Sequence, residues 1–475
     1  MTPKKRKKII VNYQLSIINS IKKCIFAFYF YTMEKYSIVI ILLAIAIGLY
    51  PVSAKLRFPY PILLLVVGIG VGFVPHFEAI DINPEVVFLI FLPPFLYDAA
   101  YHISFKEFKR NLSVISLLAF TLVFITTSII AAFTHFILGL EWSLSFVLGA
   151  ILSPPDAIAA TGVTKNLGLP HRTSTILEGE SLINDASALV ALRFAVAAVA
   201  GSEFIFWRAG LIFLIALVGG GILGWFLAHI FIFIAKKLPD KDVIVGLNLL
   251  LPFAIYILAE EIGVSGVIAV VAFGLISSRH KRLLHEQSVM QSKSVLDTIV
   301  FILTGLIFIL IGWEFPQVLK QIPNNEFLPM IGVSFLIFLV ALLVRMVIIF
   351  RYRTRTIKRF EALKHRMDNM TEEEIQHFNN HLGKKASLKK RLEDSKSLFI
   401  SGKEAIVIGW SGMRGIVSLA AALSLPLVMA DGSSFPHRNK LIFIVVTAVI
   451  IMLLIQGLGL PIIIKYLKFK KEEND

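Results

Sequence analysis

The sequence is poor in two kinds of residue that soluble enzymes commonly use. Among 475 residues there is one cysteine, Cys24, and only 17% of the residues are charged. A lone cysteine forms no internal disulfide, and there is no CxxC pair or Cys/His cluster of the kind that binds zinc or iron–sulfur groups. The GxxxxGK[ST] loop that binds nucleotide phosphates is also missing. These absences argue against a redox cofactor, a resident metal and ATP.

Apolar residues dominate the composition instead. They form 56% of the chain, and the mean hydropathy is +0.78, whereas soluble domains contain roughly 45–50% apolar residues. Apolar stretches of about 20 residues recur along nearly the whole length, and each is long enough to cross a hydrocarbon layer about 30 Å thick as a helix. The sequence therefore predicts an all-α polytopic protein embedded in a lipid bilayer.

Charged residues, glycines and prolines interrupt the apolar pattern and separate about thirteen candidate transmembrane helices. We expect them at 35–53, 59–76, 84–102, 112–138, 144–164, 174–200, 205–235, 243–260, 264–278, 295–314, 327–350, 404–428 and 439–464. If the first six and the last six are repeats, helix n matches helix n+7, and this odd offset inverts the second copy. The predicted organisation is an N-terminal extension 1–32, a first repeat 33–201, a linking helix 202–238, a second repeat 239–465 and a tail 466–475.

Basic residues gather on one side of this predicted topology. With the loop after the first helix in the cytoplasm, the loops and tail on that side hold 32 Lys and Arg, whereas the opposite loops hold four. By the positive-inside rule, this difference places the C-terminus in the cytoplasm. It also explains the formal net charge of +15 without a nucleic-acid partner.

Two basic segments need a separate interpretation. The start MTPKKRKK would lie outside, so either residues 9–31 form a signal-like or additional segment or translation starts at Met33. We favour the second and assign no function to residues 1–32. The loop 351–403 contains 14 Lys and Arg and a mixed-charge stretch that favours a helix. We favour a solvated or headgroup-facing helical hairpin for it, with a regulatory or partner-binding segment as the alternative.

Two of the predicted helices carry signals for an interruption inside the membrane. In the fifth, SPPDAIAATG, the consecutive Pro154 and Pro155 remove backbone donors directly before Asp156. In the twelfth, Gly412 and Gly415 flank Arg414 at a similar depth. If the two broken helices cross, Asp156 compensates the positive helix ends and Arg414 the negative ends.

The sixth predicted helix, TSTILEGESLINDASALVALRF, contains a further group of polar side chains. Asp185 lies near its centre, Ser181 precedes it by one turn on the same face, and Asn184 adjoins it. A carboxylate with a hydroxyl one turn away is a hard-oxygen site that suits a proton or a small alkali cation. Glu180 points to a different side of the helix, where Arg345 of helix eleven is the natural partner for a structural ion pair.

Four motifs resemble those of one transporter family. LPPFLYDAAY at 92–101, SPPDAIAATG, GESLINDASALV and GMRGIVSLA occur in the order and spacing typical of the sodium/proton exchangers of the first monovalent cation:proton antiporter family. The resemblance extends over residues 35–465. It implies a homodimer in which helices one to three and eight to ten form an interface domain. Helices four to six and eleven to thirteen form a mobile core, and helix seven links the two.

The resemblance also implies roles for individual residues. It makes Asp185 the ion- and proton-binding aspartate that holds the monovalent cation, Ser181 a neighbouring ligand and Asn184 the mark of the electroneutral branch. Asp98 on helix three matches the acidic position that approaches this site from the interface domain. The implied core charge pairs are Asp156 with Arg414 and Glu180 with Arg345.

One departure from the family pattern affects the cation ligands. Relatives often have Thr-Asp-Pro where this chain has Pro-Pro-Asp, so the threonine ligand is absent and the Pro155 carbonyl or Ser153 must replace it. We expect an electroneutral one-for-one exchange of Na⁺, or Li⁺, for H⁺ that serves pH and sodium homeostasis. A K⁺/H⁺ antiporter of the same fold is the alternative, and a channel or an intramembrane enzyme is less favoured. The expected location is the cell membrane of a bacterium.

Overall fold

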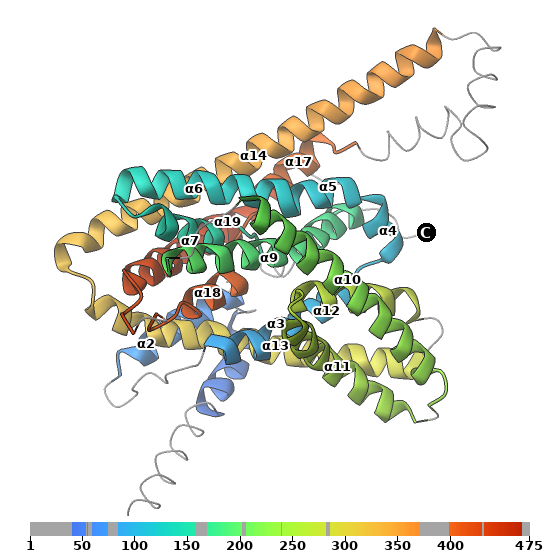
Figure 1. The fold of residues 1–475 in the computed structure, drawn as a ribbon, viewed down its shortest axis with the longest axis horizontal. Helices are drawn as coiled ribbons and strands as arrows, with labels where there is room; N and C mark the ends of the chain where they lie inside the picture. Colours follow the sequence, from blue (N-terminus) through green and yellow to red (C-terminus); the bar gives the residue numbers. More distant parts are fainter. Residues whose placement is uncertain are drawn as a thin grey trace, which may run out of the picture.

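A computed structural model describes most of the chain (Figure 1). The described residues are 40–53, 55, 59–74, 84–156, 169–201, 206–238, 240–281, 286–369, 399–429 and 432–467. The N-terminal extension 1–32, the start at Met33, the second half of the predicted fifth helix, residues 370–398 of the basic loop and most of the tail therefore lie outside the described residues.

Each of the thirteen predicted segments overlaps a helix in the described part of the chain. The first is the helix Ile40–Ser53. The others are α2 (Tyr60–Gly72), α3 (Pro84–His102), α5, η1 and α6 together (Leu112–Ser116, Leu117–Leu122, Val123–Leu138), α7 (Trp142–Leu152), α9 (His171–Val199), α10 (Phe206–Ala235), α11 (Lys241–Ile262), α12 (Gly266–Arg279), α13 (Glu286–Lys320), α14 (Asn324–Asp368), α17 with α18 (Gly402–Trp410, Ile416–Leu423) and α19 (Arg438–Leu467). The prediction of an all-α polytopic fold is confirmed.

Several of these helices meet the length and composition of a membrane span. Among the described residues, seven helical stretches are long and apolar enough, namely Leu112–Leu138, His171–Val199, Gly210–Ala235, Lys241–Ile262, Glu286–Lys320, Asn324–His365 and Arg438–Leu467. Apolar side chains suit these segments to hydrocarbon, where the backbone must satisfy its own hydrogen bonds. Only a helix does so within one segment, which explains why the segments are helical. The division of the chain into two inverted repeats stays a prediction.

Several boundaries differ from the predicted ones, and three of the differences concern the cytoplasmic side of the predicted topology. A short helix, α4 (Phe105–Arg110), occupies the predicted loop 103–111, and α13 begins nine residues before the predicted 295. The largest difference is α14, which continues to Asp368 although the predicted helix ends at 350. The drop in hydropathy at Arg351 marks the end of the apolar stretch, but the sequence has no glycine or proline between Gly332 and Gly383 to end the helix.

The interrupted helices lie inside the bundle. α7 packs against α6, α9 and α18, and α18 also contacts α19 and α13. In Figure 1, α6, α7, α14 and α19 lie together above, while α10, α11 and α12 lie together at the lower right. Leu148, Leu419 and Val445 from three of these helices belong to one buried apolar cluster. The polar ends of the broken helices are therefore surrounded by apolar side chains and need partners within the protein.

Candidate functional site

The first interruption follows α7. The helix ends at Leu152, and residues 153–156 continue as non-helical, buried chain. Pro154 and Pro155 have no backbone N–H and clash with the preceding helical turn, which explains the end of the helix at this point. The helix thus ends where the two prolines predicted a break, and the part of the predicted fifth helix beyond Asp156 lies outside the described residues.

The second interruption separates α17 from α18. Ser401 and Glu404 form a capping box at the start of α17, which ends at Trp410. Residues 412–415 are non-helical, and α18 begins at Ile416. The glycines at 412 and 415 lower the local helix propensity, as the sequence indicated. This break is also present, and it lies entirely within described residues.

The two interruptions are in direct contact. The backbone N–H of Asp156 donates a hydrogen bond to the carbonyl of Met413 at 2.6 Å. A Cβ atom on Gly415 would lie 2.0 Å from Oδ2 of Asp156 and 2.9 Å from its Cγ. Since real Cβ atoms do not approach so closely, only glycine allows the two chains to cross at this distance.

Asp156 caps a helix that belongs to the other broken segment. Its Oδ2 accepts a hydrogen bond from the backbone N–H of Ile416 at 3.0 Å, and its side chain is only 7% exposed. Ile416 is the first residue of α18, so the carboxylate faces unsatisfied amides and the positive end of the helix dipole. A residue from one interruption therefore stabilises the helix terminus at the other.

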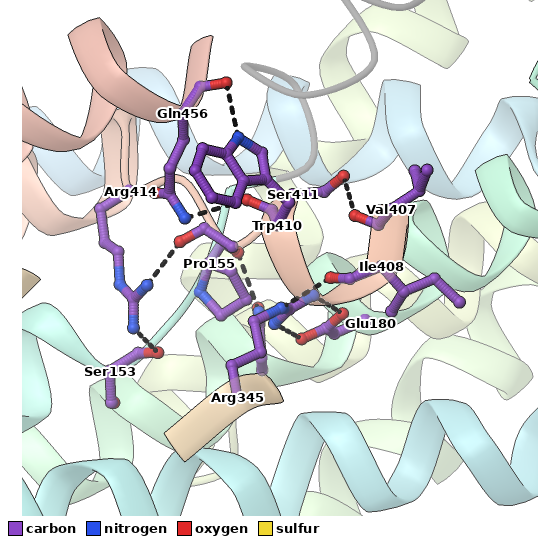
Figure 2. Close-up of polar contacts among 12 residues, drawn as sticks. Ser153, Pro155, Glu180, Arg345, Val407, Ile408, Trp410, Ser411, Arg414 and Gln456 are labelled. Carbon is purple, nitrogen blue, oxygen red and sulfur yellow. Dashed lines mark hydrogen bonds and ion pairs between the residues drawn. The ribbon is translucent and has the colours of Figure 1, made fainter. Parts of the chain in front are cut away.

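Arg414 satisfies the opposite helix ends. Its Nε donates to the carbonyl of Leu152 at 2.8 Å and its Nη2 to the carbonyl of Ser153 at 3.3 Å, where α7 ends. Its Nη1 donates to the carbonyl of Gly412, just after α17. Figure 2 shows the guanidinium reaching towards Ser153. One buried cation thus compensates the C-terminal ends of two half-helices.

Gln456 of α19 supports the same crossing and is not among the residues predicted from the sequence. Its Nε2 donates to the carbonyl of Trp410 at 2.9 Å, and the Trp410 indole Nε1 donates to the Gln456 carbonyl at 3.2 Å (Figure 2). Gln456 is 1% exposed. The only signal for it was a lone amide within the apolar stretch 441–464. It gives the last residue of α17 a partner that the broken helix cannot supply.

Asn184 connects α9 to the first interruption. Its Nδ2 donates to the carbonyl of Pro155 at 2.9 Å, and the residue is fully buried. Because a carbonyl only accepts, this contact fixes which end of the amide faces Pro155. Among the described residues, its Oδ1 atom is buried without a hydrogen-bond partner. An unpartnered buried oxygen is costly unless a proton or cation is present.

Asp185 lies beside Asn184 on α9 and is 6% exposed. Asp156 is within the range of electrostatic interaction with it. Ser181 is one turn earlier on the same helix and half-buried. A carboxylate, an unpartnered amide oxygen and a nearby hydroxyl are the oxygen ligands that hard cations take.

The pair Glu180 and Arg345 joins three helices. Both guanidinium nitrogens Nη1 and Nη2 of Arg345 bind the carboxylate of Glu180, at 2.5 and 2.7 Å. Arg345 Nε also donates to the carbonyl of Ile408 at 2.9 Å (Figure 2). The Arg345 side chain is 2% exposed and the Glu180 side chain 1%. α9, α14 and α17 are thereby linked next to the second interruption.

Asp98 on α3 is engaged differently from the residues at the crossing. Its Oδ1 lies 3.1 Å from Nδ1 of His102 one turn later, and Nε2 of His102 lies 4.0 Å from Asp297 of α13. In the described part of the chain, no hydrogen bond joins Asp98 to Asp185. The role of Asp98 near the ion site stays a prediction.

Comparison with known proteins identifies the family. The family model for the transmembrane part of the sodium/hydrogen exchangers matches residues 38–466. The chain belongs to the sodium/hydrogen exchanger family. The resemblance inferred from the four motifs is therefore confirmed. Members of this family are secondary transporters that exchange a cation for protons across a membrane, and this protein is such an antiporter rather than an enzyme.

Individual relatives agree with this assignment. An uncharacterized Na⁺/H⁺ exchanger of Mycobacterium tuberculosis is 31% identical over 405 residues, which cover 84% of this chain and 69% of that protein. A sodium, potassium, lithium and rubidium/H⁺ antiporter of Bacillus pumilus is 32% identical over 394 residues, 81% of this chain and 54% of that protein. The solved sodium proton antiporter MjNhaP1 of Methanocaldococcus jannaschii shares the fold, with a TM-score of 0.66, 18% identity and coverage of 92% of this chain and 99% of that one.

Proposed function

We propose that this exchanger moves Na⁺, or Li⁺, in one direction and H⁺ in the other, one for one and without net charge transfer. Asp185 is the carboxylate that both ions share. The observation that carries the proposal is the pairing of a buried Asp185 with a neutral Asn184, whose oxygen has no hydrogen-bond partner in the described part of the chain. Regulation of cytoplasmic pH and sodium is the physiological task that such an exchange serves.

The physical reason for obligatory exchange is the cost of an uncompensated charge. An ionised carboxylate in a low-dielectric interior loses several kcal/mol of hydration unless a counter-charge is present. Asp185 therefore holds either a proton or a cation when it crosses the apolar barrier, and never both. Asp156 is excluded from this cycle, because its carboxylate caps α18 in the same structure. With one carboxylate titrating, one proton replaces one monovalent cation.

The proposed cation ligands are the carboxylate of Asp185, Oδ1 of Asn184, the hydroxyl of Ser181 and the carbonyl of Pro155. A carbonyl oxygen has two lone pairs, so the hydrogen bond from Asn184 to Pro155 leaves one for a cation. The Ser153 hydroxyl donates to the Ala150 carbonyl at 3.2 Å, and its own oxygen keeps acceptor capacity. Ser153 is thus a second substitute for the absent threonine.

K⁺/H⁺ exchange is the second candidate function. The Bacillus pumilus relative is named as an antiporter of sodium, potassium, lithium and rubidium. A site that takes all four ions must tolerate large differences in ionic radius. The same ligands would serve such a range if the non-helical stretch 153–156 adjusts its carbonyls to the cation.

The experiment uses purified protein in vesicles with an imposed pH gradient, to which Li⁺, Na⁺ or K⁺ is added. We expect Na⁺ and Li⁺ to dissipate the gradient and Asp185→Asn to abolish this response while the protein remains folded. Asp242→Asn, which removes an exposed carboxylate on α11, is the matched control with unchanged exchange. Exchange by Asp185→Asn would refute the shared-carboxylate mechanism, and a K⁺ response equal to that of Na⁺ would favour the second candidate.

We also propose that the protein is a homodimer in a bacterial cell membrane with its C-terminus in the cytoplasm. The orientation rests on the excess of Lys and Arg in the loops on one side. Cysteine substitutions near the C-terminus, labelled from the outside of intact cells, test the orientation. Cross-linking in membranes tests the dimer.

A further inference from the structure

The helix α14 extends beyond its membrane-spanning part. Its apolar stretch ends at Phe350, and the helix continues without interruption to Asp368. Figure 1 shows this part of α14 projecting past the rest of the bundle, on the side where α4 lies. The residue that follows Phe350 is Arg351, so the first basic side chain stands directly at the end of the apolar stretch.

Four basic side chains form a stripe along this extension. They lie at spacings of four, seven and eight residues, which place them on one helical face about 100° wide. The basic stripe consists of Arg351, Arg355, Lys358 and Arg359, and all four are exposed. The adjoining face packs inward, because Thr356 is buried and Tyr352, next to Arg359 on the helix surface, packs on the apolar cluster that contains Ile349 and Ile400. The charged side of the extension is therefore directed away from the protein.

No carboxylate neutralises the stripe within the described part of the chain. The ion pairs found there involve none of its four members. Glu361, the acidic residue nearest in sequence, neighbours the end of the stripe three residues after Lys358, but it forms none of the ion pairs found in the described residues. Four unneutralised positive charges on one face attract an anionic surface.

The stripe also lies at the right height for lipid headgroups. A helix rises about 1.5 Å per residue, so Arg355 is about 6 Å and Arg359 about 12 Å beyond Arg351 along the axis. The headgroup layer on each side of the hydrocarbon is about 5–8 Å thick, and charges act over a Debye length of about 8–10 Å. Arg351 and Arg355 thus fall within the headgroup layer, and the other two act on it from just outside.

We propose that the basic stripe of α14 binds the phosphate groups of anionic phospholipids in the leaflet that surrounds the helix. Three of its four members are arginines, whose planar guanidinium groups bind phosphate oxygens through two parallel hydrogen bonds. Orientation during insertion needs only positive charge and no fixed face, whereas lipid binding needs the register that these residues have. This binding is independent of which cation the protein transports.

Lipid binding at this position would act on the transport core through one rigid element. Arg345, which holds Glu180 and the carbonyl of Ile408, precedes Arg351 by six residues on the same helix. That separation is about 9 Å along the helix axis. Anchoring the stripe to the headgroups therefore fixes the depth of the Arg345 pair relative to the membrane.

The test measures lipid selectivity directly, with spin-labelled phosphatidylglycerol or phosphatidylcholine in vesicles that contain the full-length protein. The fraction of immobilised label gives the preference for the anionic lipid. The stripe variant R351Q/R355Q/K358Q/R359Q is compared with a control that removes the same charge elsewhere, K106Q/K109Q/K236Q/K237Q, whose lysines are all exposed. We expect the stripe variant to lose about tenfold in preference and the control to retain it. The preference of the wild type should also fall at 1 M salt, where the Debye length is about 3 Å.

Equal preference in the wild type and the stripe variant, or equal losses in the stripe variant and the control, would overturn the proposal. A wild type without any preference would do the same, and would point to another acidic occupant, such as the TEEE stretch at 371–374. The unfolding midpoint of every variant is measured first. If the fourfold variant does not fold, the double variant R355Q/R359Q carries the test with K236Q/K237Q as its control.

Discussion

The carboxylate of Asp156 accepts a hydrogen bond from the backbone N–H of Ile416 at 3.0 Å, so the break after α7 caps the half-helix that begins at the other break. The second break stabilises the first in return, because Arg414 donates hydrogen bonds to the carbonyls of Leu152 and Ser153. Each interruption supplies the charge that the other one needs. The crossing therefore forms one electrostatic unit, and neither half can be altered without loss to the other.

Removing the cap at Asp156 should disturb this unit. In Asp156→Ala the N–H of Ile416 becomes a buried donor without a partner, at a cost of about 1–3 kcal/mol. We expect a lower unfolding midpoint in detergent and loss of exchange in vesicles. Asp240→Ala is the matched control, since Asp240 caps the exposed start of α11 through the N–H of Asp242 at 2.9 Å. Equal exchange rates in the two variants would show that the crossing does not depend on Asp156.

Gly415 should tolerate no side chain. Its Cβ would lie 2.0 Å from Oδ2 of Asp156, so Gly415→Ala must separate the two interruptions at an overpacking cost of about 1–3 kcal/mol. Gly402→Ala at the start of α17 is the control, because its Cβ would meet only Arg353 Nη2, at 3.9 Å. We expect exchange to be lost in the first and kept in the second. Normal exchange by Gly415→Ala would contradict the close contact at the crossing.

The ion pair between Glu180 and Arg345 should be essential for stability. Glu180→Gln leaves a buried guanidinium without its counter-charge, which costs about 3–5 kcal/mol. The exposed pair of Arg193 and Glu260, with its 2.7 Å contact, offers a comparison. Breaking it with Arg193→Gln should cost about 0–1 kcal/mol. Thermal unfolding in detergent distinguishes the two, and similar midpoints would mean that the buried pair is not a structural one.

Asn184 should not be replaceable by aspartate. Its Nδ2 donates to the Pro155 carbonyl at 2.9 Å, whereas a carboxylate has no donor and would repel that oxygen. We expect Asn184→Asp to unfold at a lower temperature and to lose exchange rather than to become electrogenic. Asn324→Asp, at the exposed start of α14, controls for the added charge. A stable Asn184→Asp variant that generates current would show that the hydrogen bond from Asn184 to Pro155 is not needed, and that Asn184 matters only because it is uncharged.

The parts of the site that the sequence predicts are those with local causes. Pro154 and Pro155 remove donors from their own helix, and Gly412 and Gly415 weaken theirs, so both breaks could be located without a structure. Ionisable residues in apolar stretches are costly enough to stand out by themselves. The spacing of Asp185 and Ser181 on one face likewise follows from helix geometry.

The missed features depend on distant partners. Gln456 contacts Trp410 across 46 residues of sequence, and nothing in either segment names the other. The extension of α14 was missed because hydropathy reports where the apolar stretch ends, whereas helix continuity depends on the absence of glycine and proline.

The most direct test of the shared carboxylate is the null point of transport. Vesicles with a tenfold sodium gradient are prepared over a range of pH differences, and the pH difference at which no net flux occurs is determined. If Asp185 exchanges one proton for one cation, the null lies at about one pH unit and does not move with membrane potential. A null near half a pH unit, or one that shifts with the potential, would contradict the account.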